Sequence, residues 1–234
     1  MSYREYAPPL ELVPWLACTW ERLSEGGPPV RVVPDGCIDV VWTENGGTQI
    51  VGANTTAFLV PLTPGVRVVG ARLRPGAAPG LLGVASEALR DARVPVESAW
   101  GSDGARLTAA LDEHVDPVDG LRAALLGWAA CAERPDPLVC EAVTRLAQPG
   151  VAVAHLASEL TVSERHLRRR VSAAVGYGPK RLARVLRLGR ALEAARDGDD
   201  LARVALDAGY VDQAHFANDC RALAGVPPSV VLSA

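Results

Sequence analysis

The sequence predicts an α+β chain with two domains: a small β-rich domain with some helices at the N-terminus, and an all-α domain at the C-terminus. Two observations support this division. Short runs rich in β-branched residues fill residues 30–73, whereas helical periodicity dominates the later part of the chain. Charge divides in the same way, because residues 138–234 carry 13 Lys and Arg against 10 Asp and Glu, and residues 1–137 carry 11 against 17. The basic C-terminal part is therefore the part that we expect to contact nucleic acid.

The composition excludes several classes of protein. With 234 residues, the chain can form two domains that each bury a core. No apolar run reaches membrane-spanning length, and the start, MSYREYAPPLE, lacks the apolar segment of a signal peptide. We therefore expect a cytoplasmic protein with no membrane partner, no metal and no cofactor. The cysteines, which show no CxxC spacing and are expected to be free thiols, are Cys18, Cys37, Cys131, Cys140 and Cys220.

The N-terminal domain begins, on this pattern, with an extended arm from Tyr3 to Trp20, because prolines interrupt it. A small antiparallel β-unit follows, with turn residues such as those at 34–36 and 45–47 between its strands. The rest of the domain is expected to be mainly helical. The expected strands are 30–33, 37–42, 48–52, 57–60 and 66–73, and the expected helices include 89–94, 105–115 and 118–134. Residues 133–137, with two prolines, are the expected linker between domains 1–132 and 138–234.

The first helical unit of the C-terminal domain has a helix, a short turn and a second helix. Leu156, Ala157 and Leu160 share one helix face, and Ser163 followed by Glu164 is typical of a new helix start. In that second helix, apolar residues recur on one side, and the opposite side presents Arg165, Arg168, Arg169 and Ser172 without a nearby acid. Arginine matches the paired acceptors of guanine and phosphate oxygens, so the pattern predicts a DNA-recognition helix. His166 and Arg170 lie beside this face, and Arg170 is expected to meet phosphate.

A second unit follows about fifty positions later. Val204 and Ala205 belong to an apolar helix stripe, Gly209 and Tyr210 make the turn, and Asp212 is placed to cap another helix. The outward and flanking residues of that helix are Gln213, Ala214, His215, Asn218 and Arg221. Between the units, a helix opens at Pro179 and is expected to close at Gly198. About 17 residues make a rod of roughly 25 Å. With its turns, this rod can place two recognition helices near the ~34 Å repeat of the major groove.

The segments LASELTVSERHLRRRV, GYGPKRLARVLRLGRAL and VALDAGYVDQAHFANDCRALAGVPPS resemble the two helix-turn-helix units and connecting helix of AraC/XylS transcription regulators. The resemblance implies double-stranded promoter DNA as partner and RNA polymerase as a possible further one. It assigns base contacts to Arg165, Arg168 and Arg169 in the first unit. In the second unit it assigns Gln213, Ala214, His215 and Asn218. The family often has a basic residue where Asn218 stands, so we expect the first unit to contribute more of the affinity.

The segments VVPDGCIDVVW, RLRPGAAPGLLGV and LRDARVPVESAWG resemble the N-terminal regulatory domain of one AraC-type subgroup. This implies a cupin-like or related β-fold that senses a small molecule of unknown identity or forms a homodimer. Core and turn roles are the alternative for every effector candidate. Those candidates are Trp15, Trp20, Asp35, Cys37, Asp39 and Trp42.

The sequence thus predicts a sequence-specific, one-component transcription regulator that is not an enzyme. The competing hypothesis is a thiol-dependent enzyme or redox sensor at Cys37, next to Asp39, with an accessory DNA-binding domain. The alternative that we favour is a structural role, in which Cys37 packs as a small apolar residue in a buried strand. A third possibility is an interaction protein that keeps this fold but acts through protein partners. No nucleotide-binding glycine loop or GxSxG motif occurs.

Overall fold

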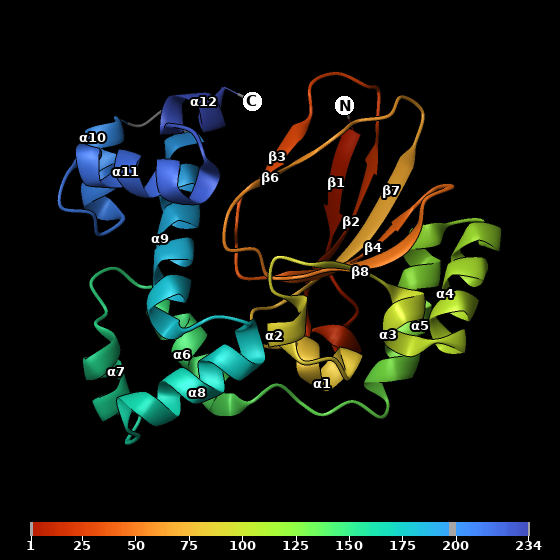
Figure 1. Cartoon of the computed structure of the whole chain (residues 1–234), viewed down its shortest axis with the longest axis horizontal. Coiled ribbons are helices and arrows are strands. Elements are labelled where there is room, and N and C mark those ends of the chain that lie inside the picture. The colour runs from red at the N-terminus through yellow and green to blue at the C-terminus, as the bar shows by residue number, and fades with distance from the viewer. Residues whose placement is uncertain (1, 197–199, 234) are drawn as a thin grey trace.

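The structure, a computed structural model, describes residues 2–196 and 200–233. Its N-terminal domain is built on a six-stranded antiparallel sheet with the order β1-β2-β7-β4-β5-β8, accompanied by a separate two-stranded sheet of β3 and β6. Figure 1 places this domain on the right and the helices of the C-terminal domain on the left. The strands are β1 Ser2–Tyr6, β2 Leu16–Leu23, β3 Val30–Val32, β4 Ile38–Thr43, β5 Gly47–Val51, β6 Phe58–Val60, β7 Arg67–Leu73 and β8 Arg93–Pro95.

One face of the large sheet forms the core of the N-terminal domain. Along β4, Ile38, Val40 and Trp42 are buried, and the residues between them are only partly buried, as the two-residue period of a strand requires. Helices α4 and α5 pack on the sheet (Figure 1). The Trp42 indole donates a hydrogen bond to Asp112 Oδ1 at 2.8 Å. The helical segments are the 3-10 helix η1 Leu10–Leu12, and α1 Ala78–Leu82, α2 Ser86–Leu89, α3 Val96–Trp100, α4 Ser102–Glu113 and α5 Pro117–Ala129.

The opposite face of the sheet is filled by polar and aromatic side chains. Trp20 pairs with Gly70 across β2 and β7, and a Cβ added at Gly70 would lie 2.2 Å from the Trp20 ring, so the indole rests on the glycine backbone. The Trp20 indole N–H donates to Asp39 Oδ1 at 2.9 Å. Arg72 lies between β2 and β4 on the same face. A glycine at position 70 is therefore required by the close approach of Trp20.

The C-terminal domain consists of two helix-turn-helix units on either side of a long helix (Figure 1). Ser163 accepts a hydrogen bond from the His166 N–H at 3.2 Å, and Asp212 accepts one from the His215 N–H at 2.7 Å. Both predicted caps are thus confirmed. The helices are α6 Pro137–Leu146, α7 Val153–Glu159, α8 Glu164–Val175, α9 Pro179–Arg196, α10 Leu201–Asp207, α11 Gln213–Ala224 and α12 Pro228–Leu232. The expected end of α9 at Gly198 lies outside the described residues.

The predicted α+β fold with these two parts is confirmed, but two local predictions are wrong. The expected extended arm contains β1 and β2, because Pro8 and Pro9 lie between these strands and leave both free to pair. The expected helix 89–94 is a turn followed by β8, in which Asp91 has φ 56°. Strand β8 pairs with β5 at the edge of the sheet, where its Pro95 needs no ladder hydrogen bond. Among the described residues, no helix is both long and apolar enough to cross a bilayer.

Candidate DNA-binding surface

Helix α8 presents uncompensated positive charge. Leu167, Val171 and Val175 are buried, so the helix packs through one stripe. Arg165, Arg168 and Arg169 are exposed, and none of the three forms an ion pair with a described residue. The structure therefore brings these predicted arginines together on the outer side of the helix, and a guanidinium group without an acidic partner is free to bind an anion.

The neighbouring predicted residues differ in position. Arg170 points to the other side of α8 and donates to Asp136, with Nε 2.7 Å from Oδ2. The structure thus separates it from the other arginines and occupies it with an internal ion pair. His166 is partly buried, and its Nδ1 lies 3.3 Å from Arg169 Nη2. Ser172 is also partly buried, beside Gly178.

Three arginines of α9, Arg184, Arg187 and Arg190, form hydrogen bonds within the C-terminal domain. Arg184 and Arg187 both donate to Asp219 on α11, at 2.7 Å to Oδ1 and Oδ2 respectively. Burial alone would raise the pKa of Asp219, but the hydrogen bonds from Arg184 and Arg187 outweigh it and hold the pKa below its ordinary value. Arg190 donates to the Ala208 carbonyl at 2.8 Å. Much of the basic block in the sequence therefore fixes the second unit to α9.

Helix α11 presents a less charged surface than α8. Gln213, Ala214 and Asn218 are exposed, and Arg221 donates to Asn218 Oδ1 at 3.2 Å. His215 is different, because its ring is partly buried with its edge against Tyr210, at a centroid distance of 5.1 Å. The structure therefore brings the predicted residues of α11 onto one helix but gives the His215 ring a packing contact.

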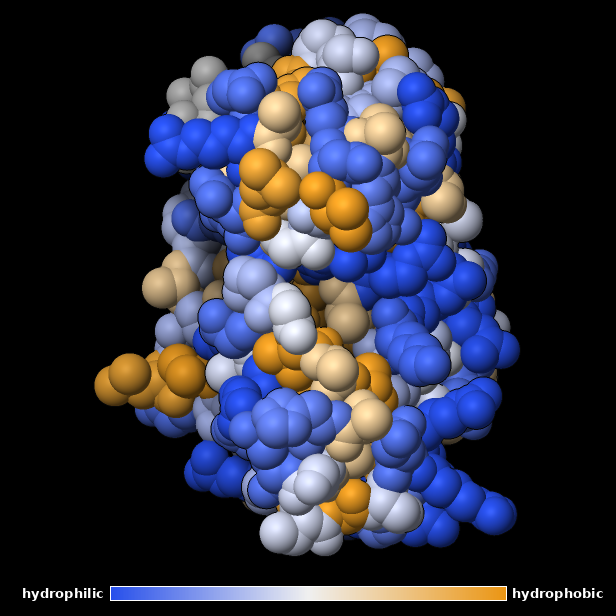
Figure 2. All heavy atoms as spheres, turned by 90° about the vertical axis from the view of Figure 1, so that its left-hand side faces the viewer, coloured by the Kyte–Doolittle hydropathy of each residue, from blue (hydrophilic) through white to orange (hydrophobic). Residues whose placement is uncertain are grey.

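Apolar side chains are also exposed in the second unit. Leu206 and Val211 on either side of its turn are 60% and 77% exposed. Figure 2 views the side formed by α7, α8, α10 and α11, and shows apolar patches within a mostly hydrophilic face in both its upper and lower halves. The second unit can thus offer methyl groups and amides to DNA, whereas the first offers guanidinium groups.

The helix-turn-helix domain family matches residues 156–234, which span both units and the helix between them. This match identifies the C-terminal domain as an AraC-type helix-turn-helix domain. The chain is therefore a DNA-binding transcription regulator. Its N-terminal residues 4–95 match a domain of unknown function, DUF6597. No curated protein sequence matches this chain.

Solved structures resemble this chain in two ways. A probable AraC family transcriptional regulator from Rhodopseudomonas palustris is 25% identical, covering 41% of this chain and 91% of its own, with a TM-score of 0.35. A DNA-binding transcriptional dual regulator from Escherichia coli K-12 is 25% identical, covering 44% and 94%, with a TM-score of 0.38. Apo ToxT from Vibrio cholerae is 12% identical but covers 92% of this chain and 97% of its own, with a TM-score of 0.50. The ToxT likeness concerns the fold of nearly the whole chain.

The structure divides the predicted effector residues into two groups. Trp15 and Trp42 are buried in the core of the N-terminal domain, and the Trp15 indole donates to the Glu133 carbonyl at 3.0 Å. Trp20, Asp35, Cys37 and Asp39 instead lie in the region of Arg72, on the other side of the sheet. Arg72 Nε is 3.5 Å from Asp35 Oδ2 and 3.6 Å from Asp39 Oδ1, and its Nη1 is 3.3 Å from Glu5 Oε1.

Two ionisable groups in this region have shifted pKa values. Burial raises the pKa of Asp39 to about 6, against the opposing effect of the Arg72 guanidinium. Burial also raises the pKa of the Cys37 thiol well above its ordinary value, and the carboxylates of Asp35 and Asp39 add to the effect. A raised thiol pKa lowers the thiolate fraction, so the environment of Cys37 is the opposite of that of a nucleophilic cysteine.

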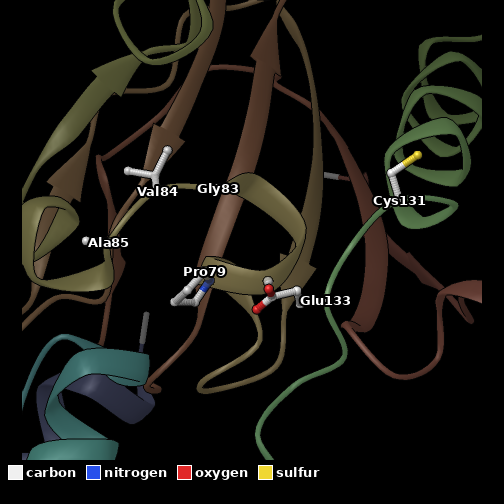
Figure 3. Close-up of a pocket in the computed structure, with 7 residues that line it drawn as sticks. Pro79, Gly83, Val84, Ala85, Cys131 and Glu133 are labelled. Carbon is white, nitrogen blue, oxygen red and sulfur yellow. The ribbon is translucent and has the colours of Figure 1, made fainter.

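The N-terminal domain has a cavity of about 360 Å³ away from these residues. It lies where α1 meets the segment that leaves α5, and its lining includes Pro79, Val84, Cys131 and Glu133. Figure 3 shows the Glu133 carboxylate near Pro79, whereas the Cys131 thiol points away from the other labelled side chains. None of the predicted effector residues lines this cavity.

Contacts between the two domains involve the C-terminal ends of α8 and α11. Ser86 Oγ donates to the Ala174 carbonyl at 2.7 Å, and Arg90 Nη1 donates to the Gly176 carbonyl at 3.1 Å, at the end of α8. At the end of α11, Arg31 Nη1 donates to the Ala224 carbonyl at 2.9 Å. The Ala57 N–H donates to the adjacent Leu223 carbonyl at 2.7 Å. The last carbonyls of a helix lack partners within it, so the N-terminal domain supplies donors that the ends of α8 and α11 need. Sequence reasoning missed these contacts, because no local signal marks them.

Proposed function

We propose that this chain is a one-component regulator that binds specific promoter DNA through α8 and α11, with α8 contributing more of the affinity. The observation that carries the proposal is the row of three exposed arginines on α8, Arg165, Arg168 and Arg169, which have no acidic partner within residues 2–196 and 200–233. Three uncompensated guanidinium groups on a capped helix match guanine edges and phosphates of a major groove. The amide and methyl groups of α11 match adenine and thymine.

The direct test measures binding of the full chain to DNA fragments selected from a random pool, by fluorescence anisotropy over a range of salt concentrations. We expect a selected sequence and a negative slope of log affinity against log salt, because phosphate contacts release counterions. Replacing Arg165 and Arg169 by Ala should abolish the preference. The matched control is Arg106→Ala in α4, which removes a distant exposed arginine. Absence of binding at every salt concentration would contradict the proposal.

We further propose that the N-terminal domain regulates DNA binding through its contacts with both recognition helices. Its sequence carries an excess of six acidic residues over basic ones, which repel DNA when the domain is docked beside α8 and α11. A small molecule or a partner that releases the contacts at Ser86 and Arg90 would then raise the affinity for DNA. The cavity of about 360 Å³ beside Glu133 is the candidate effector site, because it borders the segment that joins the domains.

The test of this regulation is the double substitution of Ser86 and Arg90 by Ala in the full chain. We expect faster amide exchange at the end of α8 and tighter DNA binding, since both hydrogen bonds to α8 carbonyls are lost. The matched control substitutes Ser102 and Arg106, which are exposed on α4. Faster exchange with unchanged affinity would refute the regulatory role and leave the DNA-binding role intact.

The competing thiol-enzyme hypothesis predicts rapid alkylation of Cys37 near neutral pH. The raised pKa of this thiol favours slow alkylation instead. RNA polymerase and a second copy of this chain remain further proposed partners of the DNA-bound protein.

A further inference from the structure

A second cavity, of about 530 Å³, lies beside the recognition helix of the first unit. Its walls come from the starts of α7, α8 and α9 and from Gly178, which precedes α9. The residues that matter here are Glu164, Arg165, Arg168, Gly178, Lys180 and Arg181.

The charges around this cavity are strongly unbalanced. Four of these side chains are cationic and one is acidic. The side chains of Arg165, Arg168 and Lys180 form no hydrogen bond or ion pair with any described residue. Arg181 donates to the Thr55 carbonyl at 3.1 Å, which is a neutral acceptor that leaves the charge of the guanidinium uncompensated. The cavity therefore has the electrostatic character of an anion site.

Gly178 lines the cavity with backbone atoms alone, because it has no side chain. A Cβ added there would meet only Ser172 Oγ at 3.6 Å and Arg168 Cγ at 3.9 Å. The stem of Arg168 therefore runs beside Gly178, towards the start of α9. Arg169 projects from α8 about 100° further round the helix and does not line the cavity. Arg165 and Arg168 therefore line the cavity, whereas Arg169 points away from it.

Helix α9 adds to the positive potential. It runs for 18 residues, and the N–H groups of its first turn carry the positive end of the helix dipole. The Arg181 and Leu182 N–H groups donate to the Gly178 carbonyl, and Pro179 has no N–H. The side chains of Lys180 and Arg181 start from this same turn, so the fixed charges and the dipole act on the same space.

We propose that this cavity binds one phosphate group of the DNA backbone beside the groove that α8 enters. Arg168 and Lys180 hold the phosphate, and Arg169 is left to read bases. This inference rests on the proposed DNA-binding function and assigns to Lys180 a contact that the sequence patterns do not predict. A free phosphate compound has the same chemistry, and the experiment separates these two sources.

The first measurement is the salt dependence of DNA binding by the full chain carrying Lys180→Ala. One lost phosphate contact should reduce the slope of log affinity against log salt by about 0.9. The loss should be equal for the selected sequence and for its single-base variants, because phosphates carry no sequence information. Arg168→Ala should behave in the same way. Arg169→Ala should instead relax the preference for one base pair, and Arg106→Ala is the matched control.

The second measurement uses Lys180 as the single lysine of the chain. Reductive methylation with ¹³C-formaldehyde labels only this side chain and the N-terminal amine, and it keeps the charge. We expect selected DNA to shift the Lys180 methyl signal, and inorganic phosphate at millimolar concentration to leave it in place.

Each outcome has a separate meaning. Saturable shifts with inorganic phosphate, together with an unchanged salt slope in Lys180→Ala, would assign the cavity to a free phosphate compound and overturn the proposal. DNA binding by the wild type without a signal shift or a slope change would also overturn it, while the DNA-binding function stands. Absence of DNA binding by the wild type would instead contradict the proposed function itself.

Discussion

Arg170 on α8 and Asp136 in the segment between the domains form an ion pair, with Arg170 Nε 2.7 Å from Asp136 Oδ2. The adjacent Arg169 has no acidic partner among the residues that the structure describes. Asp136 also accepts a hydrogen bond from the Leu138 N–H at 3.0 Å and so caps α6. Two neighbouring arginines of one helix therefore have different roles, one facing solvent and one fixing the helix to α6.

The first prediction contrasts these two arginines. Arg169→Ala should relax the preference for one base pair without changing stability, because its guanidinium faces solvent and is proposed to read bases. Arg170→Ala should leave DNA binding unchanged and lower the free energy of unfolding by about 1 kcal/mol, since Asp136 loses its partner. Anisotropy and urea denaturation measure the two effects. A reduced salt slope in Arg170→Ala would show that Arg170 leaves Asp136 to bind DNA.

The second prediction concerns Asp219, which is only 5% exposed and accepts hydrogen bonds from Arg184 and Arg187. Asp219→Ala should lower the free energy of unfolding by about 1–3 kcal/mol, because two guanidinium groups lose their shared carboxylate. Urea denaturation gives the value. The control is Asp207→Ala, whose exposed carboxylate lies 3.6 Å from Arg203 and should contribute about 0.5 kcal/mol or less. A similar loss in both variants would contradict the buried pairing.

The third prediction concerns Gly70 beneath Trp20. Gly70→Ala should destabilise the N-terminal domain by about 1–3 kcal/mol, because the new methyl group would lie 2.2 Å from the indole. Gly127→Ala is the matched control, since an added Cβ there meets no atom within 4 Å and the position is in helix α5. The control should be stabilised by roughly 0.5–1 kcal/mol. Thermal unfolding of both variants, monitored by Trp fluorescence, measures the two changes in stability.

The fourth prediction concerns the pH dependence of stability at Asp39. Burial raises its folded pKa to about 6, whereas an unfolded aspartate has a pKa of about 4. Between these values the folded state retains a proton that the unfolded state releases, so this group lowers stability as pH rises. Asp39→Asn removes the effect and still offers the Trp20 indole an acceptor. The difference in free energy of unfolding between the variant and the wild type should increase by about 1–3 kcal/mol, in favour of the variant, from pH 4 to pH 6.5. Urea denaturation at each pH measures this difference. A constant difference across that range would contradict the raised pKa.

How much the sequence predicts depends on how local each signal is. The caps at Ser163 and Asp212 depend on residues three positions away, and both were predictable from that spacing. Likewise, Arg165 and Arg168 were predicted to face outward from helical periodicity alone. By contrast, Asp219 pairs with Arg184, 35 positions away, and no local pattern connects them.

The errors have a similar cause. Prolines at 8 and 9 indicated an extended arm, but they occupy only the connection between β1 and β2. The segment 89–94 has residues compatible with a helix, and its pairing with β5 depends on residues 42 to 46 positions earlier, as in Val51 with Arg93 and Gln49 with Pro95. No sequence motif predicted a role for Lys180. Its side chain lines the same cavity as Arg168 only because the chain turns between α8 and α9.

The length of α9 also constrains the DNA itself. Its 18 residues form a continuous rod of about 27 Å, and Asp219 fastens α11 to it. A rod of this kind does not stretch, so the duplex has to curve wherever its groove repeat differs from the helix separation. Bending a site of this size costs on the order of 1–6 kcal/mol, and flexible pyrimidine–purine steps lower that cost. The base pairs between the two recognised segments, which no side chain touches, should therefore influence affinity through their deformability.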